Sequence, residues 1–324
     1  MKNIICLNKN YSTTRLLTKE KPVIESCEND KFRSVLFLPE GEGRKGEGGL
    51  RTKGYFKKSY PDKPLITIIT VVFNGEKYLE ETIKSVINQT YDNVEYIIID
   101  GGSTDGTLDI IKKYEDKIDY WVSEKDNGMY DALNKGFSIS QGDICAWLNA
   151  DDFYQKWALE YVALIMKKNK YVKWLTGIPV LYNEKGFIVY VSPPKTYFTT
   201  FIRMGLYKKG ILGWLQQESM FWRRELLEKV GYLNKNLKLA ADYDLWIKFS
   251  KYENLYTVKT ILGGFRVHNN RLNNLNFLKK YFEECESIKK IRLKCFFRFI
   301  KPIINFFSIF IPWRKLTILD YKGK

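Results

Sequence analysis

Short apolar runs alternate with longer amphipathic segments along residues 65–149, and this alternation restricts the chain to few folds. Residues 65–73 (LITIITVVF) and 94–100 (VEYIIID) are continuous, β-branched and apolar, as strands covered on both faces are. Residues 76–89, which lie between them, carry apolar side chains at helical spacing. Strand, helix and strand at this rhythm predict βαβ units and a mostly parallel sheet flanked by helices.

The same patterns predict the elements of the rest of the chain. The first half continues with a helix over 106–114, a strand over 119–124, a helix over 129–140 and a strand over 143–149. The second half is less regular, with a hairpin over 176–193, a strand over 218–224, a short helix over 225–231, a helix over 241–252 and further strand over 256–268. These elements form one α/β domain, which we expect to span residues 64–276.

The chain has a segment of different character at each end of this domain. Residues 1–63 form an N-terminal extension in which 39–54 (PEGEGRKGEGGLRTKG) is rich in Gly and charge and is predicted to be a loop. A short strand is expected over 35–38. Residues 277–324 are basic and aromatic and are predicted to begin as a helix.

The charge of the chain indicates an anionic partner. There are 53 Lys and Arg residues against 37 Asp and Glu, a formal net charge of +16, which favours nucleic acid, anionic lipid or a phosphorylated substrate. No nucleic-acid-binding motif is recognisable, so nucleic acid is the weakest of the three. The five cysteines show no metal-binding or disulfide spacing, which is typical of a reducing cytosol.

No part of the sequence predicts export or a membrane span. The apolar stretch 4–7 is too short for a signal peptide, and no run approaches the roughly 20 apolar residues that a spanning helix needs. We therefore expect a soluble or peripheral protein.

Polar residues follow three of the predicted parallel strands, at the edge of the sheet where ligands bind in such folds. They are the turn 73–75, Asp100, and the sequence 149–152 (NADD). Gly101 and Gly102 after Asp100 allow a ligand to approach the backbone, and the Asp100 carboxylate suits the N–H edge of a pyrimidine ring. The simpler interpretation is a well-capped loop between strand and helix.

Two further groups are candidates for phosphate and metal binding. Lys135 and the helix start after Asp126 are placed to meet phosphate oxygens, although a solvated helix face explains them equally. The neighbouring carboxylates Asp151 and Asp152 repel each other unless the turn stays wet or a cation lies beside them. Mg²⁺ and Mn²⁺ prefer carboxylate oxygens and share their coordination with substrate phosphates, which gives this pair a chemical purpose.

The second half offers a candidate base and one histidine. Asp242 and Asp244 lie at the start of a predicted helix, where Asp is also favoured by the helix dipole alone. His268 is the only histidine, and a single histidine is more often structural than a ligand.

Six stretches, taken in order, resemble the family 2 glycosyltransferases of the GT-A fold over roughly residues 65–270. They are ITIITVVFNGEKYLEETIKSVINQTY, IIIDGGSTDGT, DNGMYDALNKG, GDICAWLNADD, QQESMFWRRELLEKVG and ADYDLWIKF. The resemblance implies a GT-A, Rossmann-like α/β fold with a mixed, mostly parallel sheet. It also implies an inverting transferase that takes a sugar from a nucleotide diphosphate donor.

The resemblance implies a role for particular residues. Nucleotide contacts fall to Val72, Phe73, Asn74, Asp100, Asp126, Asn134, Lys135, Asn149 and Ala150. Asp151 and Asp152, with His268, are the implied ligands of Mn²⁺ or Mg²⁺, and Asn149 replaces the first Asp of the usual D-x-D motif. Asp242 is the implied catalytic base, and Ala241 replaces the Glu that such enzymes use toward the acceptor.

The tail favours a membrane-associated role. Residues 289–301 contain six basic residues and no acidic one, and an aromatic, apolar stretch interrupted by Pro302 and Pro312 surrounds and follows them. This composition is typical of a segment on anionic lipid, although a helix packed on the domain is the alternative. We therefore expect a cytoplasmic enzyme on the inner face of the membrane, acting on a glycan or lipid-linked acceptor of surface polysaccharide such as O-antigen or capsule. A catalytically silent nucleotide-sugar-binding or scaffolding protein is the alternative that Asn149 and Ala241 leave open.

Overall fold

The computed structural model describes residues 4–24, 34–208, 211–213, 215–268, 275–290, 301–304 and 318–319. A nine-stranded sheet forms its centre, in the order β15-β13-β9-β12-β7-β4-β5-β6-β2. The parallel part is made by β4 (Ile66–Val72), β5 (Val94–Asp100), β6 (Tyr120–Ser123) and β7 (Ile144–Trp147). This confirms the α/β fold and the strands predicted from the apolar runs.

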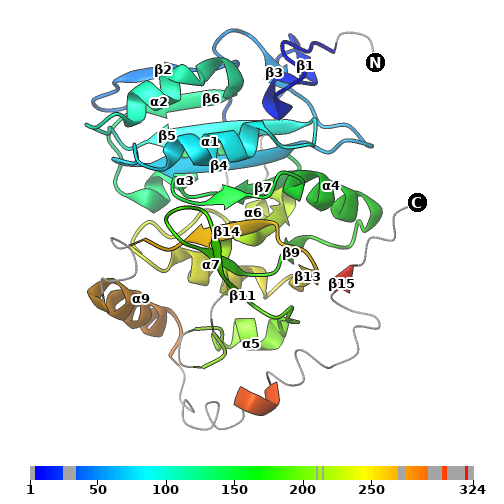
Figure 1. The fold of residues 1–324 in the computed structure, drawn as a ribbon, viewed down its shortest axis with the longest axis vertical. Helices are drawn as coiled ribbons and strands as arrows, with labels where there is room; N and C mark the ends of the chain where they lie inside the picture. The colour runs from blue at the N-terminus through cyan, green and yellow to red at the C-terminus, as the bar shows by residue number, and fades with distance from the viewer. Residues whose placement is uncertain are drawn as a thin grey trace.

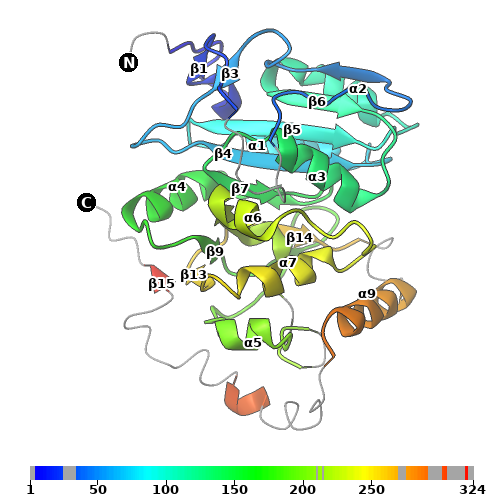
Figure 2. The same cartoon turned by 180° about the vertical axis from the view of Figure 1, so that it is seen from behind.

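Helices cover both faces of this sheet. On one face lie α1 (Leu79–Ile87), α2 (Thr107–Lys113) and α4 (Ala158–Lys168). On the other lie α3 (Met129–Ile139), α6 (Arg224–Val230) and α7 (Ala241–Phe249), which come to the front in Figure 2. Strand β4 is buried along its whole length because its side chains alternate between the two helical layers (Figure 1).

The register of the parallel strands brings the polar strand ends together. Val72 at the end of β4 pairs with Asp100 at the end of β5, and Ile69 of β4 pairs with Trp147 of β7. The turns that follow these strands therefore lie at one edge of the sheet, as the sequence predicts.

The other half of the large sheet is mixed in direction. Strand β12 (Met220–Arg223) runs antiparallel to both β7 and β9 (Trp174–Thr176), after the short 3-10 helix η3 (Gln217–Ser219). Strand β13 (Tyr256–Val258) is parallel to β9 and to β15 (Ile318–Leu319). Between the halves, four buried tryptophans pack together, with the rings of Trp147 and Trp246 stacked 5.7 Å apart.

A second, four-stranded sheet has the order β11-β10-β14-β8. The predicted hairpin is confirmed as β10 (Val180–Tyr182) and β11 (Ile188–Val191), which pair antiparallel. Strand β14 (Gly263–Arg266) joins β10 to β8 (Phe153–Tyr154), which follows the NADD turn directly. Helix α5 (Thr199–Arg203) lies beyond the hairpin at the lower end of the molecule in Figure 1.

The N-terminal extension packs on the sheet and differs in two places from the prediction. The stretch predicted as a loop contains β2 (Gly46–Gly48), which pairs antiparallel with β6. Glycine makes this pairing possible, because a Cβ on Gly46 or Gly48 would lie within 2.9 Å of the Trp121 ring. The short strand expected over 35–38 is wrong, since these apolar residues pack against the core without strand pairing.

The remaining elements are short, except at the C-terminal side of the domain. The extension also contains the 3-10 helix η1 (Ser12–Thr14) and the antiparallel pair β1 (Leu17–Thr18) and β3 (Phe56–Lys57), and η2 (Glu115–Lys117) follows α2. Helix α9 (Leu275–Ile288) confirms the helix expected at the start of the tail. Most of the basic stretch 289–301 lies outside the described residues. Within the described part, none of the helices combines the length and apolar character that crossing a bilayer requires.

Candidate active site

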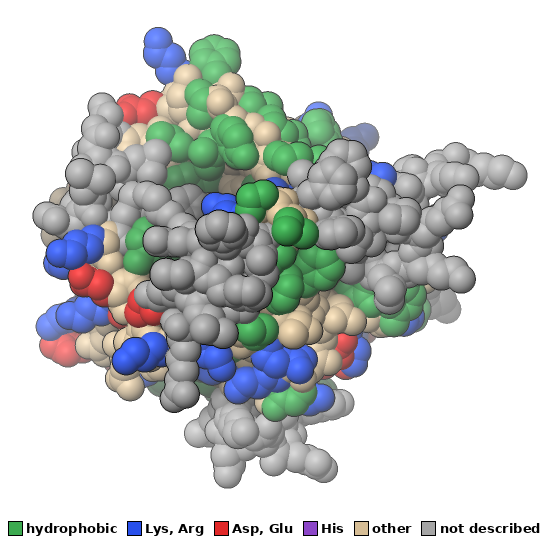
Figure 3. All heavy atoms as spheres, turned by 90° about the horizontal axis from the view of Figure 1, so that it is seen from below, with side chains coloured by type: hydrophobic (Ala, Val, Ile, Leu, Met, Phe, Trp, Pro, Cys, Tyr) green, Lys and Arg blue, Asp and Glu red, His purple; other side chains and the backbone are tan. Residues whose placement is uncertain are grey.

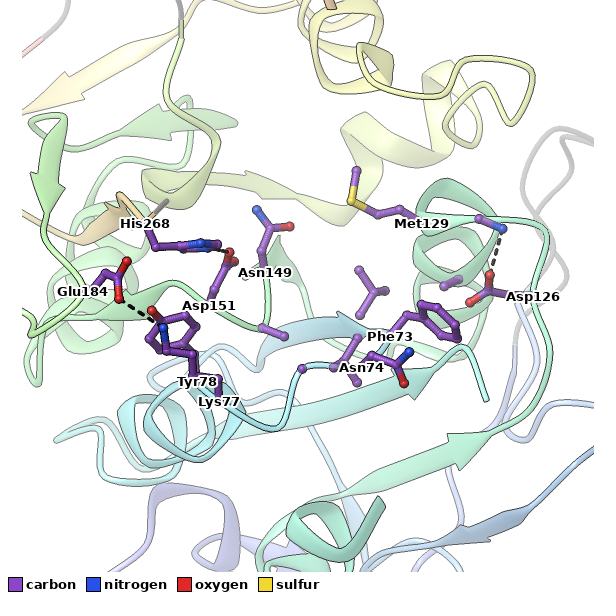
Figure 4. Close-up of a pocket in the computed structure, with 16 residues that line it drawn as sticks. Phe73, Asn74, Lys77, Tyr78, Asp126, Met129, Asn149, Asp151, Glu184 and His268 are labelled. Carbon is purple, nitrogen blue, oxygen red and sulfur yellow. Dashed lines mark hydrogen bonds and ion pairs between the residues drawn. The ribbon is translucent and has the colours of Figure 1, made fainter. Parts of the chain in front are cut away.

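A cavity of about 700 Å³ opens where the parallel strands end. Its wall takes residues from the turn after β4, from the start of α3, from the NADD turn, and from the second sheet (Figure 4). The lining residues are Val71, Val72, Phe73, Asn74, Gly75, Lys77, Tyr78, Asp126, Gly128, Met129, Ala132, Asn149, Ala150, Asp151, Glu184 and His268. The structure therefore brings six of the nine nucleotide-binding candidates together with the metal-binding candidates Asp151 and His268.

One end of the cavity is apolar and aromatic. The side chains of Phe73 and Met129 flank it in Figure 4, with exposed fractions of 65% and 41%. Asn74 holds this turn in the left-handed conformation (φ 51°), and its side-chain oxygen accepts a hydrogen bond from the Thr104 N–H at 2.8 Å. Its backbone N–H donates to the Ser103 hydroxyl at 2.7 Å. The turn that presents Phe73 is thus fixed by the loop that follows β5.

Asp126 lies at the same end and is partly buried. Its carboxylate accepts a hydrogen bond from the Gly128 N–H at 2.8 Å, and burial raises its pKa above the ordinary value. A Cβ on Gly101 would lie 2.6 Å from an Asp126 oxygen, so glycine is required there for the two loops to meet. The result is a carboxylate that faces the cavity beside an aromatic ring.

The other end of the cavity carries both acidic and basic side chains. The Asp151 carboxylate lies 2.9 Å from Nε2 of His268, although 117 positions separate them in sequence. The His268 ring lies 5.3 Å from the Tyr78 ring, centroid to centroid. Lys77 and Glu184 form an ion pair of 3.0 Å close by (Figure 4). Charge is therefore concentrated at this end.

Asp152 faces away from the cavity. It is fully buried, and its two oxygens accept hydrogen bonds from the Arg266 N–H at 2.8 Å and from the Asn149 amide at 3.1 Å. Because these contacts hold Asp152 inside the protein, only Asp151 of the pair lines the cavity. The structure thus gives Asp152 a bracing position and does not bring it to Asp151 and His268.

Arg266 ties the acidic end to three other elements. This guanidinium is 1% exposed and donates to the backbone oxygens of Asp151 at 2.9 Å and Glu184 at 2.8 Å. It also forms an ion pair with Glu81 of α1 and lies 4.7 Å from the Tyr78 ring centre. A planar cation with five donors suits such a junction, because it bonds in several directions at once.

Three of the nucleotide-binding candidates also lie outside the cavity wall. Asp100 is fully buried, and the hydroxyls of Ser103 and Ser123 donate to its carboxylate. Asn134 is bound through both side-chain atoms to the backbone of Leu233, at 2.9 and 3.0 Å. These contacts fix the loop after β5 and connect α3 to the segment after α6.

Lys135 is the third nucleotide-binding candidate that lies outside the cavity wall. Its ammonium lies 2.6 Å from Glu124, which also binds Arg44 of the N-terminal extension at 2.7 Å. Glu124 is almost completely buried, so its charge is balanced by one cation on each side. Lys135 therefore braces the wall of the site from outside.

Asp242 lies at the start of α7 and is partly buried beneath α9, with one carboxylate oxygen shut off from solvent. Burial raises its pKa to about 7, although backbone N–H groups and a hydrogen bond with Tyr281 of α9 oppose this. Glu284 of α9 accepts hydrogen bonds from the backbone N–H groups of 238–240, with that of Ala240 at 2.6 Å. Tyr130, in the first turn of α3, faces Asp242 from the other side. The structure does not bring Asp242 to the cavity.

The acidic end suits a divalent cation that is shared with a substrate. Asp151 and His268 supply a carboxylate oxygen and an imidazole nitrogen, which Mn²⁺ and Mg²⁺ sites use to different degrees. In the described part of the chain, His, Cys, Asp and Glu form no cluster of three or more that would hold a metal alone. A cation at this place would therefore complete its coordination with phosphate oxygens and water.

Sequence reasoning missed Lys77, Tyr78, Met129 and Glu184. The sequence pattern places Lys77 and Tyr78 at the start of a predicted helix and Glu184 in a predicted hairpin, and neither position indicates a binding site. The sequence does contain a signal for Lys77, because it is the only basic residue between Lys63 and Lys84 and it follows the end of a predicted strand.

Comparison with known proteins identifies the family. Residues 67–231, about half of the chain, match the sequence model of Glycosyl transferase family 2. The chain belongs to glycosyl transferase family 2. An uncharacterized glycosyltransferase of Rickettsia typhi is 32% identical over 222 residues, which cover 67% of this transferase and 69% of the relative. The putative teichuronic acid biosynthesis glycosyltransferase TuaG of Bacillus subtilis is 28% identical over 258 residues, 75% of this chain and 97% of that protein.

Solved structures share the fold of this family 2 glycosyltransferase. TarS 1-349 of S. aureus in complex with UDP-GlcNAc superposes with a TM-score of 0.55 at 17% identity, over 75% of this chain and 73% of that one. The mannosyltransferase PcManGT of Pyrobaculum calidifontis, in complex with GDP-Man and Mn²⁺, gives 0.52 at 19% identity, over 76% and 70%. These similarities confirm the GT-A fold, which the sequence predicts.

Proposed function

We propose that the enzyme transfers a sugar from a nucleotide diphosphate sugar to an acceptor hydroxyl with inversion, in the synthesis of a surface polysaccharide. The observation that supports this most is the polarity of the cavity, which runs from an aromatic end at Phe73 to a charged end at Asp151 and His268. A nucleotide sugar has the same polarity, with a flat base at one end and a charged diphosphate near the other.

In this proposal the base lies against Phe73 and Met129, and Asp126 and Asn74 offer it polar contacts. Val72, Asn149 and Ala150 line the wall along which the ribose and diphosphate lie. Asp100, Asn134 and Lys135 act on the nucleotide through the loops that they brace. Lys77 lies on the diphosphate side of the cavity and supplies positive charge there.

Asp151 and His268 would hold Mn²⁺ or Mg²⁺ against the diphosphate, with Asp152 fixing the turn from behind. When bound, the cation neutralises charge on the departing nucleotide diphosphate. PcManGT, a structural neighbour, was solved with Mn²⁺ and a nucleotide sugar, which supports the choice of metal.

Asp242 is the proposed base. The acceptor oxygen attacks the anomeric carbon as the bond from that carbon to the diphosphate oxygen breaks, and the acceptor proton passes to the Asp242 carboxylate. A pKa of about 7 suits a base that works near neutral pH. Since Tyr281 and Glu284 hold α9 over this residue, α9 has to move before an acceptor reaches it.

The acceptor is proposed to be a glycan or a lipid-linked sugar of O-antigen or capsule type. The TuaG relative, named for teichuronic acid biosynthesis, supports a surface polysaccharide. The basic, aromatic sequence 289–301 supports a position at the inner face of the cytoplasmic membrane.

Donor binding with and without metal tests this function. Thermal-shift titration of a panel of nucleotide sugars should identify one that raises the melting temperature, and should do so more strongly with Mn²⁺. Asp151→Ala should abolish the dependence on Mn²⁺ while the fold survives, because Asp151 lies in a turn outside the helices and strands and its carboxylate lines the cavity. Asp116→Ala, an exposed carboxylate outside the cavity wall, is the control and should bind as the wild type does. Full metal dependence in Asp151→Ala would reject the assignment.

A further inference from the structure

The hairpin strand β11 exposes an unbroken apolar sequence. Phe187, Ile188, Val189, Tyr190 and Val191 have exposed fractions of 66%, 52%, 56%, 51% and 45%. Both faces of the strand are exposed, so none of these side chains serves the core. Exposed apolar side chains gathered in one place mark interaction surfaces.

This strand also lies at the edge of its sheet. Among the described strands it pairs only with β10, so its outer backbone edge is free of strand partners there. Soluble proteins protect such edges with charged residues or proline, and 187–191 contain neither. An exposed apolar edge of this kind promotes aggregation, so we expect another surface to cover β11 when the protein works.

The turn of the hairpin is closed by hydrogen bonds and lies at the cavity. The Asn183 side chain accepts hydrogen bonds from the backbone N–H groups of Lys185 and Phe187, both at 3.0 Å. Glu184 in the same turn lines the charged end of the cavity and is bound by Arg266 through its backbone oxygen. The apolar strand thus begins beside the place where transfer is proposed to occur.

Positive charge lies at the other end of the strand. Lys195 follows β11 closely, and its pKa is lowered by burial and by the neighbouring ammonium of Lys301 from the tail. Ile303, two residues further, is 56% exposed. Figure 3 views the molecule from the end where α5 lies and shows apolar side chains beside a group of Lys and Arg. Two cations held close together beside apolar side chains match an anionic headgroup layer.

We propose that β11, with Lys195 and Lys301, docks the catalytic domain on an anionic lipid bilayer. The apolar side chains of the strand enter the headgroup region, while the two lysines meet lipid phosphates. This inference deepens the proposed function, because it places the charged end of the cavity at the height of a lipid-linked acceptor. It differs from membrane binding by the tail, since it makes the catalytic domain itself a lipid-binding surface.

Vesicle binding by the full chain tests this surface. Wild type should sediment with vesicles that contain phosphatidylglycerol and much less with pure phosphatidylcholine, and added salt should weaken the binding. The double variant Ile188→Ser and Tyr190→Ser should bind phosphatidylglycerol vesicles about tenfold or more weakly, because two inserted side chains are lost. The control double variant, Tyr171→Ser and Tyr252→Ser, removes exposed rings of 58% and 48% from other elements and should bind as the wild type does.

The outcomes separate this proposal from its rivals and from the proposed function. Equal vesicle binding by both double variants would overturn it. So would a wild-type dimer in light scattering that the Ile188→Ser and Tyr190→Ser changes convert to monomer without altering vesicle binding, since β11 would then join two copies. Hydrolysis of the nucleotide-sugar donor in solution, measured without lipid, should be the same in all three proteins. Its absence in all three would reject the transferase site and leave the vesicle result standing.

Discussion

Replacing Asp242 with Asn should make the protein more stable and less active, and both effects should depend on pH. The Asp242 residue is partly buried beneath α9, one of its carboxylate oxygens is shut off from solvent, and burial raises its pKa to about 7. In the unfolded chain an Asp has a pKa of about 3.9. Between these two values the folded protein keeps a proton that the unfolded chain has released, so its stability falls as the pH rises.

The size of the effect follows from the size of the shift. Each pKa unit corresponds to about 1.4 kcal/mol, so a shift of roughly three units costs about 4 kcal/mol at pH 8. At pH 5 the destabilisation is only about 1.5 kcal/mol, because this pH lies only about one unit above the pKa of the unfolded, already largely ionised Asp, while the folded Asp keeps its proton. Asn does not titrate, so the stability gained by Asp242→Asn should grow by about 2–3 kcal/mol from pH 5 to pH 8.

Urea denaturation at the two pH values measures this difference directly. Asp244→Asn, which removes an ion pair of 2.7 Å with Lys248 on the same helix, is the matched control and should change stability by less than about 1 kcal/mol. Turnover of the wild type should rise with pH through about 7, and Asp242→Asn should lower it by roughly 10²–10⁴-fold at pH 8. A stability gain that is equal at both pH values would refute the argument from burial. Unchanged turnover in Asp242→Asn would mean that another group is the base.

Two further predictions concern the N-terminal extension. Arg51→Met should lower the free energy of unfolding by about 3–5 kcal/mol in urea denaturation, because it leaves Glu95 charged and buried without its 2.6 Å partner; a loss below 1 kcal/mol would contradict this. Lys45→Met should weaken nucleotide binding about fivefold in calorimetry without changing its metal dependence, since Lys45 donates to the backbone oxygens of Gly102 and Ser103 at 2.9 and 2.8 Å and steadies the loop that bonds Asn74. Lys53→Met, on the same segment but paired with the exposed Glu115, is the control for Lys45 and should bind nucleotide normally.

The parallel half of the fold is predictable because its signals are local. Each strand from β4 to β7 is a continuous apolar run, and each intervening helix has its own apolar stripe. A parallel sheet then places the strand ends at one edge without further information, and the turn at Phe73 and the NADD turn do meet there. The alternation of residues along the chain is enough to fix this much.

The charged end of the cavity depends on contacts that sequence spacing does not encode. Asp151 and His268 are 117 positions apart, and only the resemblance to a known family links them in sequence. Which of the two neighbouring carboxylates faces the cavity is decided by Arg266, whose backbone N–H binds Asp152. That contact joins residues 114 positions apart, so no local pattern reveals it.

The N-terminal extension shows the same limit in another form. Gly-rich sequence usually signals a loop, and here glycine instead lets β2 lie across the Trp121 ring. Likewise, residues 35–38 are apolar because they pack against the core. A short apolar run predicts a strand equally well, although these residues pair with none. In both cases the tertiary partner decides between two structures that the local sequence allows.

The aromatic end of the cavity comes from the first half of the chain alone, whereas its charged end also takes residues from the second sheet. Phe73, Asn74, Asp126 and Met129 all belong to the first, parallel half, whereas Glu184 and His268 enter from the second sheet. Under the proposed function, the residues that contact the nucleoside thus come from one half of the chain, and some of those near the diphosphate come from the other. Under the same proposal, natural variation confined to the later half would change the sugar or the acceptor and leave the nucleoside contacts unchanged. One ancestral scaffold can in this way give rise to many transferases that draw on the same pool of activated nucleotides.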